Sequence, residues 1–415
     1  MDKIVRRGAL RGCVLPPCSK SYAQRALAAS LLAKGCSELR NIEFCDDTRS
    51  AMRSIECLGA RIEQLDDKTL LVEGGLHPRH PKLEVGESGL AARLFTPIAS
   101  LGGQPIRIEG RGSLLQRTML PLVKPLKDLG VWVRHHDGCL PLEVCGPLRG
   151  GETSIDGSIS SQFITGLLLA LPLAEEDTQL HVSHAVSRPY LDMTMDAAHH
   201  FGVEILHRDY EEFYIAGGQR YTPSVYAIEG DWSAAAMMLV AGATSGEITV
   251  ENIDVCSRQA DTAILRALMR AGVTTVNDHD SVTVMHKTLH AFEFDATDCP
   301  DLFPALAALA ASAEGVSKIV GTDRLEHKEC HRGEAIFEEY SKLGIEVDIS
   351  QKNTMYIRGG KIRSARVNAH NDHRMAMSLA VAALNSEQQV VIEGAECVAK
   401  SYPRFFDELE RLKID

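Results

Sequence analysis

Five glycines recur along this chain at an almost constant interval, and each follows a helix-like run and precedes an alternating, strand-like stretch. Subtracting successive positions gives steps of 71, 72, 70 and 72 residues. A glycine after a periodic apolar run is typical of a helix C-terminus, and Val/Ile-rich alternation is typical of a strand. The pattern therefore predicts a repeated α/β module of about 70 residues. The five positions are Gly59, Gly130, Gly202, Gly272 and Gly344.

A second series of apolar helical segments alternates with the glycine-terminated runs, and each segment leads into a strand. The chain thus contains six copies of one unit, with the sixth cut short just after Leu409. At 415 residues the chain exceeds the roughly 250 to 300 residues at which a single core stops growing, so we expect two domains of three units each. The predicted fold class is α/β (α+β). The apolar segments are 26–33, 91–101, 163–173, 234–243, 302–313 and 375–384.

The residues that open the six apolar segments do not repeat, and many are charged or carry hydroxyl groups. Each opening is a predicted helix N-terminus, where unpaired N–H groups and the helix dipole favour phosphate or carboxylate. Arginine adds bidentate contacts to such groups, and lysine adds a movable charge. We therefore expect ligands that carry more than one anionic group. The openings are 17–25, 86–93, 157–162, 229–233, 298–301 and 371–374, and the other helix series adds Arg117, Arg188, Lys328, Arg332 and Lys400.

Each of these residues also has an ordinary structural explanation. Ser19 and Ser21 fit helix N-caps, and Asp231 and Asp301 fit N-caps as well as they fit catalysis. The 46–48 stretch, Asp-Asp-Thr, fits part of a capping box. A single arginine near a helix start is usually a solvated surface residue. The recurrence of charge at equivalent positions of the units is what favours a functional site.

Motifs in the same order along nearly the whole chain resemble the enolpyruvylshikimate-phosphate synthase family, the 3-phosphoshikimate 1-carboxyvinyltransferases. The resemblance extends from near Pro16 to Lys400. The motifs that carry it are Ser19-Lys20-Ser21 with Arg25, Gly89 with Arg93, Asp156-Gly157-Ser158 through Gln162, Glu229-Gly230-Asp231, Pro300-Asp301, Lys328-Glu329 with Arg332, Asp372 through Met377, and Cys397 to Pro403.

The resemblance implies two similar domains of three βαβαββ units each, with the active site in the cleft between them. The N-terminal strand is expected to join the C-terminal half, so that one domain comprises residues 1–17 and 231–415 and the other 18–230. The implied reaction transfers the enolpyruvyl group of phosphoenolpyruvate to the 5-hydroxyl of shikimate 3-phosphate and releases phosphate, in chorismate and aromatic amino-acid biosynthesis. We expect no cofactor, no metal and a monomer.

The resemblance also assigns roles to individual residues. Asp301 is expected to take the hydroxyl proton, Glu329 to exchange the methylene proton, and Lys20 to lie near the attacking oxygen and the phosphate. Shikimate 3-phosphate is expected at Lys20, Ser21, Arg25, Ser160, Ser161, Gln162, Ser187, Tyr190, Asp301 and Lys328. Phosphoenolpyruvate is expected at Lys20, Gly89, Arg117, Gln162, Arg332, Arg374 and Lys400.

Several positions differ from the family pattern. Cys18 stands where the family usually has glycine, so the backbone there either does not need a positive φ or adopts one at a cost of about 1 kcal/mol. Glu87 replaces the usual Asn and adds a carboxylate near the anion site. Cys330 and His331 replace Ser and Asp, and His331 adds a group that titrates near neutral pH. The further differences are Leu90 for Thr and Thr118 for Pro.

Composition narrows the possible partners. The formal net charge is -12 and no long basic run offsets it, so nucleic acid and anionic membranes are not expected partners. The eleven cysteines include no CxxC pair, which suggests a reducing compartment. The N-terminal residues form no apolar signal-peptide core, and no apolar run approaches the roughly 18 residues of a membrane span. We expect a cytoplasmic protein whose partners are small molecules.

Two other functions stay open on the sequence alone. One is the sister transferase that acts on UDP-N-acetylglucosamine, against which the Ser-Lys-Ser and Asp-His-Arg motifs argue. The other is a non-catalytic protein that binds phosphate ligands, a function that the departures at Cys18, Glu87 and His331 would fit. Against that function, the predicted catalytic residues are all present. Phosphate release from phosphoenolpyruvate with each acceptor separates the three.

Overall fold

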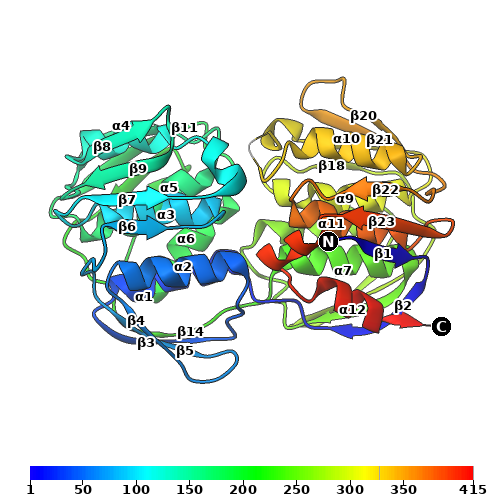
Figure 1. The fold of residues 1–415 in the computed structure, drawn as a ribbon, viewed down its shortest axis with the longest axis horizontal. Coiled ribbons are helices and arrows are strands. Elements are labelled where there is room, and N and C mark those ends of the chain that lie inside the picture. Colours follow the sequence, from blue (N-terminus) through cyan, green and yellow to red (C-terminus); the bar gives the residue numbers. More distant parts are fainter. Residues whose placement is uncertain (327, 415) are drawn as a thin grey trace. The chain divides into compact units, whose positions relative to one another are not determined.

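The chain folds into two compact units, in a computed structural model that describes residues 1–326 and 328–414. Met1–Pro17 and Glu229–Asp415 form the first unit, and Cys18–Ile228 form the second (Figure 1). The backbone therefore leaves the first unit after Pro17 and returns to it after Ile228.

The five repeated glycines end five helices in the same way, as the sequence predicts. Each glycine has a positive φ, between 82° and 124°. Its N–H donates to the carbonyl three residues earlier, and the next N–H donates to the carbonyl five residues earlier. This is the Schellman motif, which satisfies the last helix carbonyls and favours glycine because its φ is positive. The helices are α2 (Asp46–Cys57), α4 (Leu120–Asp128), α6 (Pro189–His200), α8 (Ile264–Arg270) and α10 (Arg332–Lys342).

The sixth module ends differently. Its last helix, α12 (Phe405–Arg411), extends two residues beyond the predicted end at Leu409. Leu412 follows it in place of a glycine, and β24 (Lys413–Ile414) then pairs antiparallel with β2 (Ala9–Val14).

Each sheet of the second unit has the same order, in which two parallel strands are followed by an antiparallel hairpin. The orders are β14-β3-β5-β4, β6-β7-β9-β8 and β10-β11-β13-β12. In the sheets that begin with β6 and β10 the chain follows the predicted βαβαββ course, whereas in the remaining sheet the strand parallel to β3 is β14, which comes from the end of the unit. The strands are β3 (Gly35–Arg40), β4 (Arg61–Gln64), β5 (Leu70–Gly74), β6 (Lys82–Glu84), β7 (Ile106–Glu109), β8 (Trp132–His136), β9 (Cys139–Cys145), β10 (Gly151–Asp156), β11 (Thr178–Ser183), β12 (Leu206–Arg208), β13 (Glu212–Ile215) and β14 (Val225–Ala227).

The first unit repeats this pattern with strands from both ends of the chain. One sheet has the order β18-β19-β21-β20, and the others are β16-β17-β15-β2-β24 and β1-β23-β22. The N-terminal strands complete two of these sheets, because β2 is parallel to β15 and β1 is antiparallel to β23. The strands are β1 (Lys3–Arg6), β15 (Gly246–Glu251), β16 (Thr275–Asn277), β17 (Ser281–Met285), β18 (Glu293–Asp295), β19 (Val316–Val320), β20 (Glu346–Asp348), β21 (Thr354–Arg358), β22 (Arg366–Asn368) and β23 (Gln389–Glu393).

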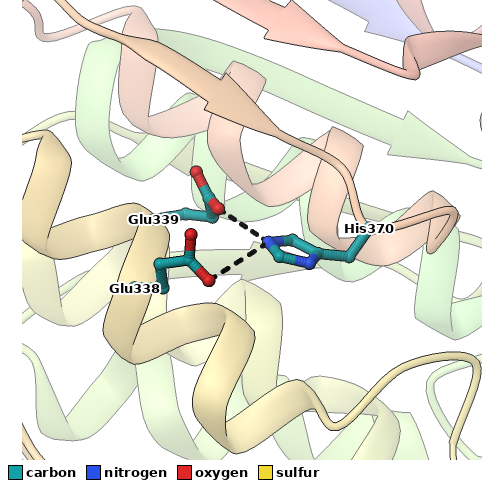
Figure 2. A group of neighbouring side chains, drawn as sticks. All are labelled: Glu338, Glu339 and His370. Atoms are coloured by element: carbon teal, nitrogen blue, oxygen red, sulfur yellow. Dashed lines mark hydrogen bonds and ion pairs between the residues drawn. The ribbon is translucent and has the colours of Figure 1, made fainter.

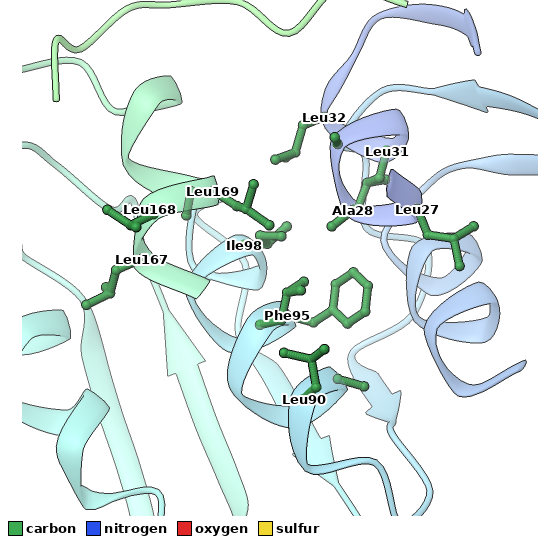
Figure 3. Close-up of a cluster of buried hydrophobic side chains, with 14 of the residues drawn as sticks. Leu27, Ala28, Leu31, Leu32, Leu90, Phe95, Ile98, Leu167, Leu168 and Leu169 are labelled. Atoms are coloured by element: carbon green, nitrogen blue, oxygen red, sulfur yellow. The ribbon is translucent and has the colours of Figure 1, made fainter. Parts of the chain in front are cut away.

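The apolar segments form the core helices of the two units. In α3, α9 and α11 every residue is buried, and the buried residues include Arg93 of α3 and Arg374 of α11. In the second unit the side chains of α1, α3 and α5 form one cluster, with Phe95 and Ile98 of α3 among Leu31 of α1 and Leu169 of α5 (Figure 3). The core helices are α1 (Lys20–Leu32), α3 (Gly89–Ala99), α5 (Ser161–Ala170), α7 (Trp232–Ser245), α9 (Phe303–Ala311) and α11 (His373–Ala383).

Short 3-10 helices connect several of these elements and carry some of the predicted site residues. Among the described residues, no helix combines the length and the apolar character that crossing a bilayer requires. The 3-10 helices are η1 (Gly112–Gln116), η2 (Leu171–Leu173), η3 (Ala260–Ala263), η4 (Pro300–Leu302), η5 (Thr322–Arg324) and η6 (Ala395–Lys400).

The Schellman glycines give a direct test of the module boundary. Gly130 has φ of 88°, and an added Cβ would meet no atom closer than 3.7 Å, so Gly130→Ala isolates the backbone penalty. We expect it to destabilise the protein by about 1 kcal/mol, measured as a lower urea midpoint. Gly103→Ala is the control, because no atom lies within 4 Å of its added Cβ. Equal midpoints for the two variants would contradict this role of Gly130.

Candidate active site

Arg25 is a buried cation surrounded by neutral groups. Its side chain extends from α1 and is 1% exposed. Its guanidinium donates to Thr165 Oγ1 at 3.3 Å, Thr194 Oγ1 at 3.0 Å and the carbonyls of Ser21 and Tyr190 at 2.8 and 3.0 Å. Burial lowers the pKa of Arg25 to about 10, because no acid among the described residues pairs with it. An anion bound beside this guanidinium would offset the cost of burying the charge.

Among the other residues assigned to shikimate 3-phosphate in this unit, Ser21 and Tyr190 contact Arg25, and three more lie at the start of α5. Ser160 is the N-cap of α5, where its hydroxyl accepts from the Gln162 N–H at 3.3 Å. Ser161 is the first residue of that helix. Ser187 is buried, has φ of 54° and lies just before α6, whose first turn contains Tyr190.

Lys20 begins α1 and pairs with an acid of α2. Its Nζ lies 3.0 Å from Asp47 Oδ2, and the two side chains are 11% and 8% exposed. The sequence assigned Asp47 only to a possible capping motif, and the N-cap of α2 is in fact Cys45. Asp47 therefore holds the ammonium of Lys20, a function that sequence reasoning missed because the pair spans 27 residues.

Gly89, Arg117 and Gln162 lie together in the second unit, as the resemblance requires of a phosphoenolpyruvate site. A Cβ added at Gly89 would lie 2.7 Å from Arg117 Nη1 and 3.6 Å from Gln162 Oε1. Arg93 holds Gln162, since its Nη1 donates to Gln162 Oε1 at 2.8 Å. The Arg93 guanidinium also stacks 4.4 Å from the centre of the Phe163 ring. Arg93 is thus a positioning residue rather than a solvated surface charge.

In the first unit, Asp301 is held by three cations. Its Oδ1 lies 3.1 Å from Lys328 Nζ and 2.8 Å from Arg332 Nη1, and its Oδ2 lies 3.2 Å from Arg374 Nη2. Burial alone would raise the pKa of Asp301, but the charges of Arg374, Lys328 and Arg332 outweigh it and hold that pKa well below its usual value. Asp301 is therefore ionised at neutral pH.

Arg332 joins three acids and is fully buried. Besides Asp301, its guanidinium reaches Glu329 Oε2 at 2.7 Å and Asp372 Oδ2 at 2.7 Å. Burial would lower the pKa of Arg332, but Asp372, Glu329 and Asp301 together raise it well above its usual value. Lys400, at the end of η6, approaches Glu329 Oε1 at 3.6 Å. All the predicted site residues of this unit thus belong to one ion-pair network.

Asp372 fixes both the guanidinium of Arg332 and the start of α11. Its side chain caps the helix by accepting from the Arg374 N–H at 2.9 Å. The Arg374 guanidinium donates to Ser233 Oγ at 3.1 and 2.7 Å and to His373 Nε2 at 2.9 Å. Asp231 caps α7 through the Ala234 N–H at 2.9 Å, so the structure supports its capping function.

One further group, Glu338, Glu339 and His370, has the chemistry of metal ligands (Figure 2). His370 Nε2 lies 2.6 Å from Glu339 Oε1 and 4.0 Å from Glu338 Oε2. Lys342 Nζ already lies 2.8 Å from Glu338 and 2.9 Å from Glu339. Glu339 also accepts from the Asn368 N–H at 2.9 Å, so these residues form an ion-pair network that supports the turn before Asp372.

The residues that differ from the family pattern make contacts with their neighbours in the structure. The backbone at Cys18 does not adopt a positive φ, which decides between the two alternatives for this position, and its Sγ accepts from the Glu43 N–H at 3.1 Å. His331 caps α10, with Nδ1 accepting from the Glu334 N–H at 3.3 Å. Cys330 Sγ lies 3.7 Å from Asp372 Oδ2. Glu87 packs against Gly112, where an added Cβ would overlap its carboxylate, and η1 leads from there to Arg117.

The close approach of Arg117 to Gly89 predicts a specific defect. The Cβ of Gly89→Ala would displace the end of a flexible side chain rather than backbone, so we expect little change in stability. We expect the apparent affinity for phosphoenolpyruvate to fall about tenfold, since a charge-assisted contact is misplaced, and that for shikimate 3-phosphate to stay within about twofold. Calorimetric titration of each ligand checks this, with Gly103→Ala as control. An equal loss for both ligands would contradict it.

Comparison with known proteins finds one family that matches nearly the whole chain. The profile of the EPSP (enolpyruvylshikimate-phosphate) synthase family, described as 3-phosphoshikimate 1-carboxyvinyltransferase, matches residues 4–409. A 3-phosphoshikimate 1-carboxyvinyltransferase from Clostridium perfringens is 36% identical over 414 residues, which cover 99% of this chain and 97% of that relative. One from Methanocorpusculum labreanum is 34% identical over 420 residues, which cover 100% and 99%.

Two solved structures share the fold. An EPSP synthase from Acinetobacter baumannii gives a TM-score of 0.85 at 24% identity, covering 100% of this chain and 98% of that chain. The enolpyruvyl transferase NikO from Streptomyces tendae gives 0.78 at 18% identity, covering 99% and 96%. At these identities the structures establish the fold alone. By the family profile and the full-length relatives, the chain belongs to the EPSP synthase family.

Proposed function

We propose that this protein transfers the enolpyruvyl group of phosphoenolpyruvate to the 5-hydroxyl of shikimate 3-phosphate and releases phosphate. Membership of the EPSP synthase family supports this reaction. The observation that carries the residue roles is that one guanidinium, Arg332, contacts both Asp301 and Glu329. The reaction needs an acid and a base at one site, and this arrangement holds two carboxyl groups together.

The chemistry takes two steps. In the addition, the 5-hydroxyl oxygen bonds to C2 of phosphoenolpyruvate, its proton passes to Asp301, and the carboxyl of Glu329 protonates C3. In the elimination, the bond between C2 and the phosphate oxygen breaks, and a proton leaves the new methyl group for a carboxylate. The departing phosphate takes the proton that Asp301 had accepted and the alkene is restored, so protons and electrons balance without an oxidant or a cofactor.

Asp301 needs activation before it can act as a base. Three cations hold its carboxylate, and they make it a weak proton acceptor. An anionic substrate that draws Arg374 or Lys328 toward itself removes part of this stabilisation and raises the basicity of Asp301. Substrate binding would thus couple directly to the proton transfer.

Two groups of residues in the second unit support the assignment of substrates. Arg25 is buried among neutral donors and acceptors and suits an anionic group of shikimate 3-phosphate, with Ser21, Ser160, Ser161, Ser187 and Tyr190 completing that set. Gly89, Arg117 and Gln162 lie together and suit phosphoenolpyruvate. Cations and N–H groups that face developing negative charge stabilise the intermediate.

The UDP-N-acetylglucosamine transferase and the non-catalytic binding protein are the alternatives. Neither is favoured by a specific contact, and the family profile supports the shikimate reaction. The monomeric state and the cytoplasmic location stay predictions from the sequence.

Phosphate release by the purified protein, given phosphoenolpyruvate with either shikimate 3-phosphate or UDP-N-acetylglucosamine, tests the proposal. We expect release only with shikimate 3-phosphate. Release only with the sugar nucleotide would reassign the substrate. No release with either acceptor, from protein shown to be folded by circular dichroism, would favour the binding protein.

Lys20 is expected to contribute to turnover more than to binding. Lys20→Ala removes a cation proposed to lie near the reacting oxygen, so we expect kcat to fall by about 10² to 10³ with small changes in the Michaelis constants. Lys34→Ala, an exposed lysine just after the same helix, is the control and is expected to leave both unchanged. Unchanged kcat with raised Michaelis constants in Lys20→Ala would refute this role.

A further inference from the structure

Asp261 is a buried carboxyl group of η3 that lies next to the predicted site without belonging to it. Its side chain is 4% exposed. Its Oδ2 accepts from Ser233 Oγ at 2.5 Å, whereas its Oδ1 is buried and has no hydrogen-bond partner among the described residues. An ionised carboxylate with one buried oxygen unsatisfied is costly, so the ionisation of Asp261 depends on nearby charge.

Ser233 connects this carboxyl group to Arg374. Ser233 Oγ accepts from Arg374 Nε at 3.1 Å and from Nη2 at 2.7 Å. Because the hydroxyl has a single hydrogen and both arginine groups are donors, that hydrogen points to Asp261. The direction of all three hydrogen bonds is therefore fixed, and Asp261 orients Arg374 through Ser233.

Arg374 faces two carboxyl groups at once. Its Nη2 lies 3.2 Å from Asp301 Oδ2, on the proposed base, while the same guanidinium reaches Asp261 through Ser233. Asp301 and Asp231 both repel the negative charge of Asp261. The Cys299 thiol also faces it and stays neutral, because burial raises the pKa of that thiol.

We propose that Asp261 is a positioning residue that holds Arg374 through Ser233, and that it takes up a proton when an anionic substrate binds to that guanidinium. The identity of the anion, phosphoenolpyruvate, rests on the proposed function. The proton comes from solvent and binds a carboxylate oxygen of Asp261, so the step involves no change in oxidation state. The protonated carboxyl keeps an oxygen that accepts from Ser233.

The electrostatics around Asp261 favour such a proton uptake near neutral pH. Burial, with repulsion from Asp301, raises the pKa of Asp261 to about 7, and Arg374 opposes this rise. A bound anion would compete for the positive charge of Arg374 and so raise the pKa further. At a pH just above 7, Asp261 is partly ionised in the free protein and becomes protonated on binding.

Two consequences follow for the site. When the anion binds, the net charge of the cluster changes by less than the charge of the anion, because the proton taken up by Asp261 offsets part of that charge. The affinity for phosphoenolpyruvate must then weaken as the pH rises through about 7, since the uptake becomes harder. Asp261 would thus set the upper pH limit of binding without touching the substrate.

Titration calorimetry with phosphoenolpyruvate alone tests this, because no turnover occurs without the second substrate. The number of protons taken up is measured at pH 7.5 in two buffers of different ionisation enthalpy. Asp261→Asn keeps an oxygen that accepts from Ser233 but cannot titrate. We therefore expect this variant to take up fewer protons on binding than the wild type. We also expect it to lose the decline in affinity for phosphoenolpyruvate above pH 7. The titration of the ligand itself is common to both proteins and cancels in the difference.

Ser233→Ala tests the orientation of Arg374 separately from the charge of Asp261. It keeps the carboxyl group but breaks the link to Arg374, so we expect about tenfold weaker binding across the pH range while proton uptake persists. Asp348→Asn is the control, an acid whose side chain accepts from the Ser350 N–H at 2.8 Å. It is expected to match the wild type.

Wild-type proton uptake in Asp261→Asn would overturn the proton role, and wild-type affinity in Ser233→Ala would overturn the positioning role. Failure of the proposed function is distinguishable, because it appears as no phosphate release with shikimate 3-phosphate. The calorimetric result does not depend on that turnover.

The stability of Asp261→Asn gives an independent check. The pKa of Asp261 in the folded protein lies above its unfolded value, so its ionisation costs stability as the pH rises from about 4 to about 7. We expect Asp261→Asn to melt about 2 to 4 °C above the wild type at pH 8 and not above it at pH 5. A melting temperature below the wild type at pH 8 would contradict the account of this buried charge.

Discussion

The fully buried guanidinium of Arg332 is the interaction on which the first unit's site depends. It contacts Asp301, Glu329 and Asp372, each within 2.8 Å, and so holds the proposed base, the proposed acid and the cap of α11 in one arrangement. Removing a buried cation from such a network leaves its acids unpaired, which is far costlier than losing a surface ion pair. The position of Asp301 relative to Glu329 is therefore set by charge as much as by backbone.

The repeated module supplies the scaffold for this arrangement. Each Schellman glycine ends an outer helix, and each apolar core helix begins with residues that are not needed for the core. The first residues of these helices can therefore differ from module to module. Residues as unlike as Lys20, Gly89 and Arg374 thus occupy comparable positions on α1, α3 and α11. A fold built from equivalent modules thus presents unlike side chains from like positions, each at a helix N-terminus that favours an anionic group.

The sequence was sufficient to predict the modules because their signals are local. Gly130 and its four equivalents follow helices directly, and the apolar segments are continuous in sequence. The supporting contacts of the site could not be predicted in this way. Lys20 with Asp47, Ser233 with Asp261, and Arg93 with Gln162 are separated by 27, 28 and 69 residues, and each depends on how helices pack. Asp261 has no local motif that distinguishes it from a surface acid; its burial and its link to Arg374 appear only in three dimensions.

The proposed reaction is an addition followed by an elimination, with Asp301 as the base and Glu329 as the acid. The most direct measurement is mass spectrometry of the product formed from phosphoenolpyruvate and shikimate 3-phosphate in deuterium oxide. Addition creates a methyl group with one solvent-derived hydrogen, and elimination removes one hydrogen of the three, so we predict deuterium in the methylene group of the product. Product formed at the normal rate with no deuterium in that methylene group would contradict the mechanism.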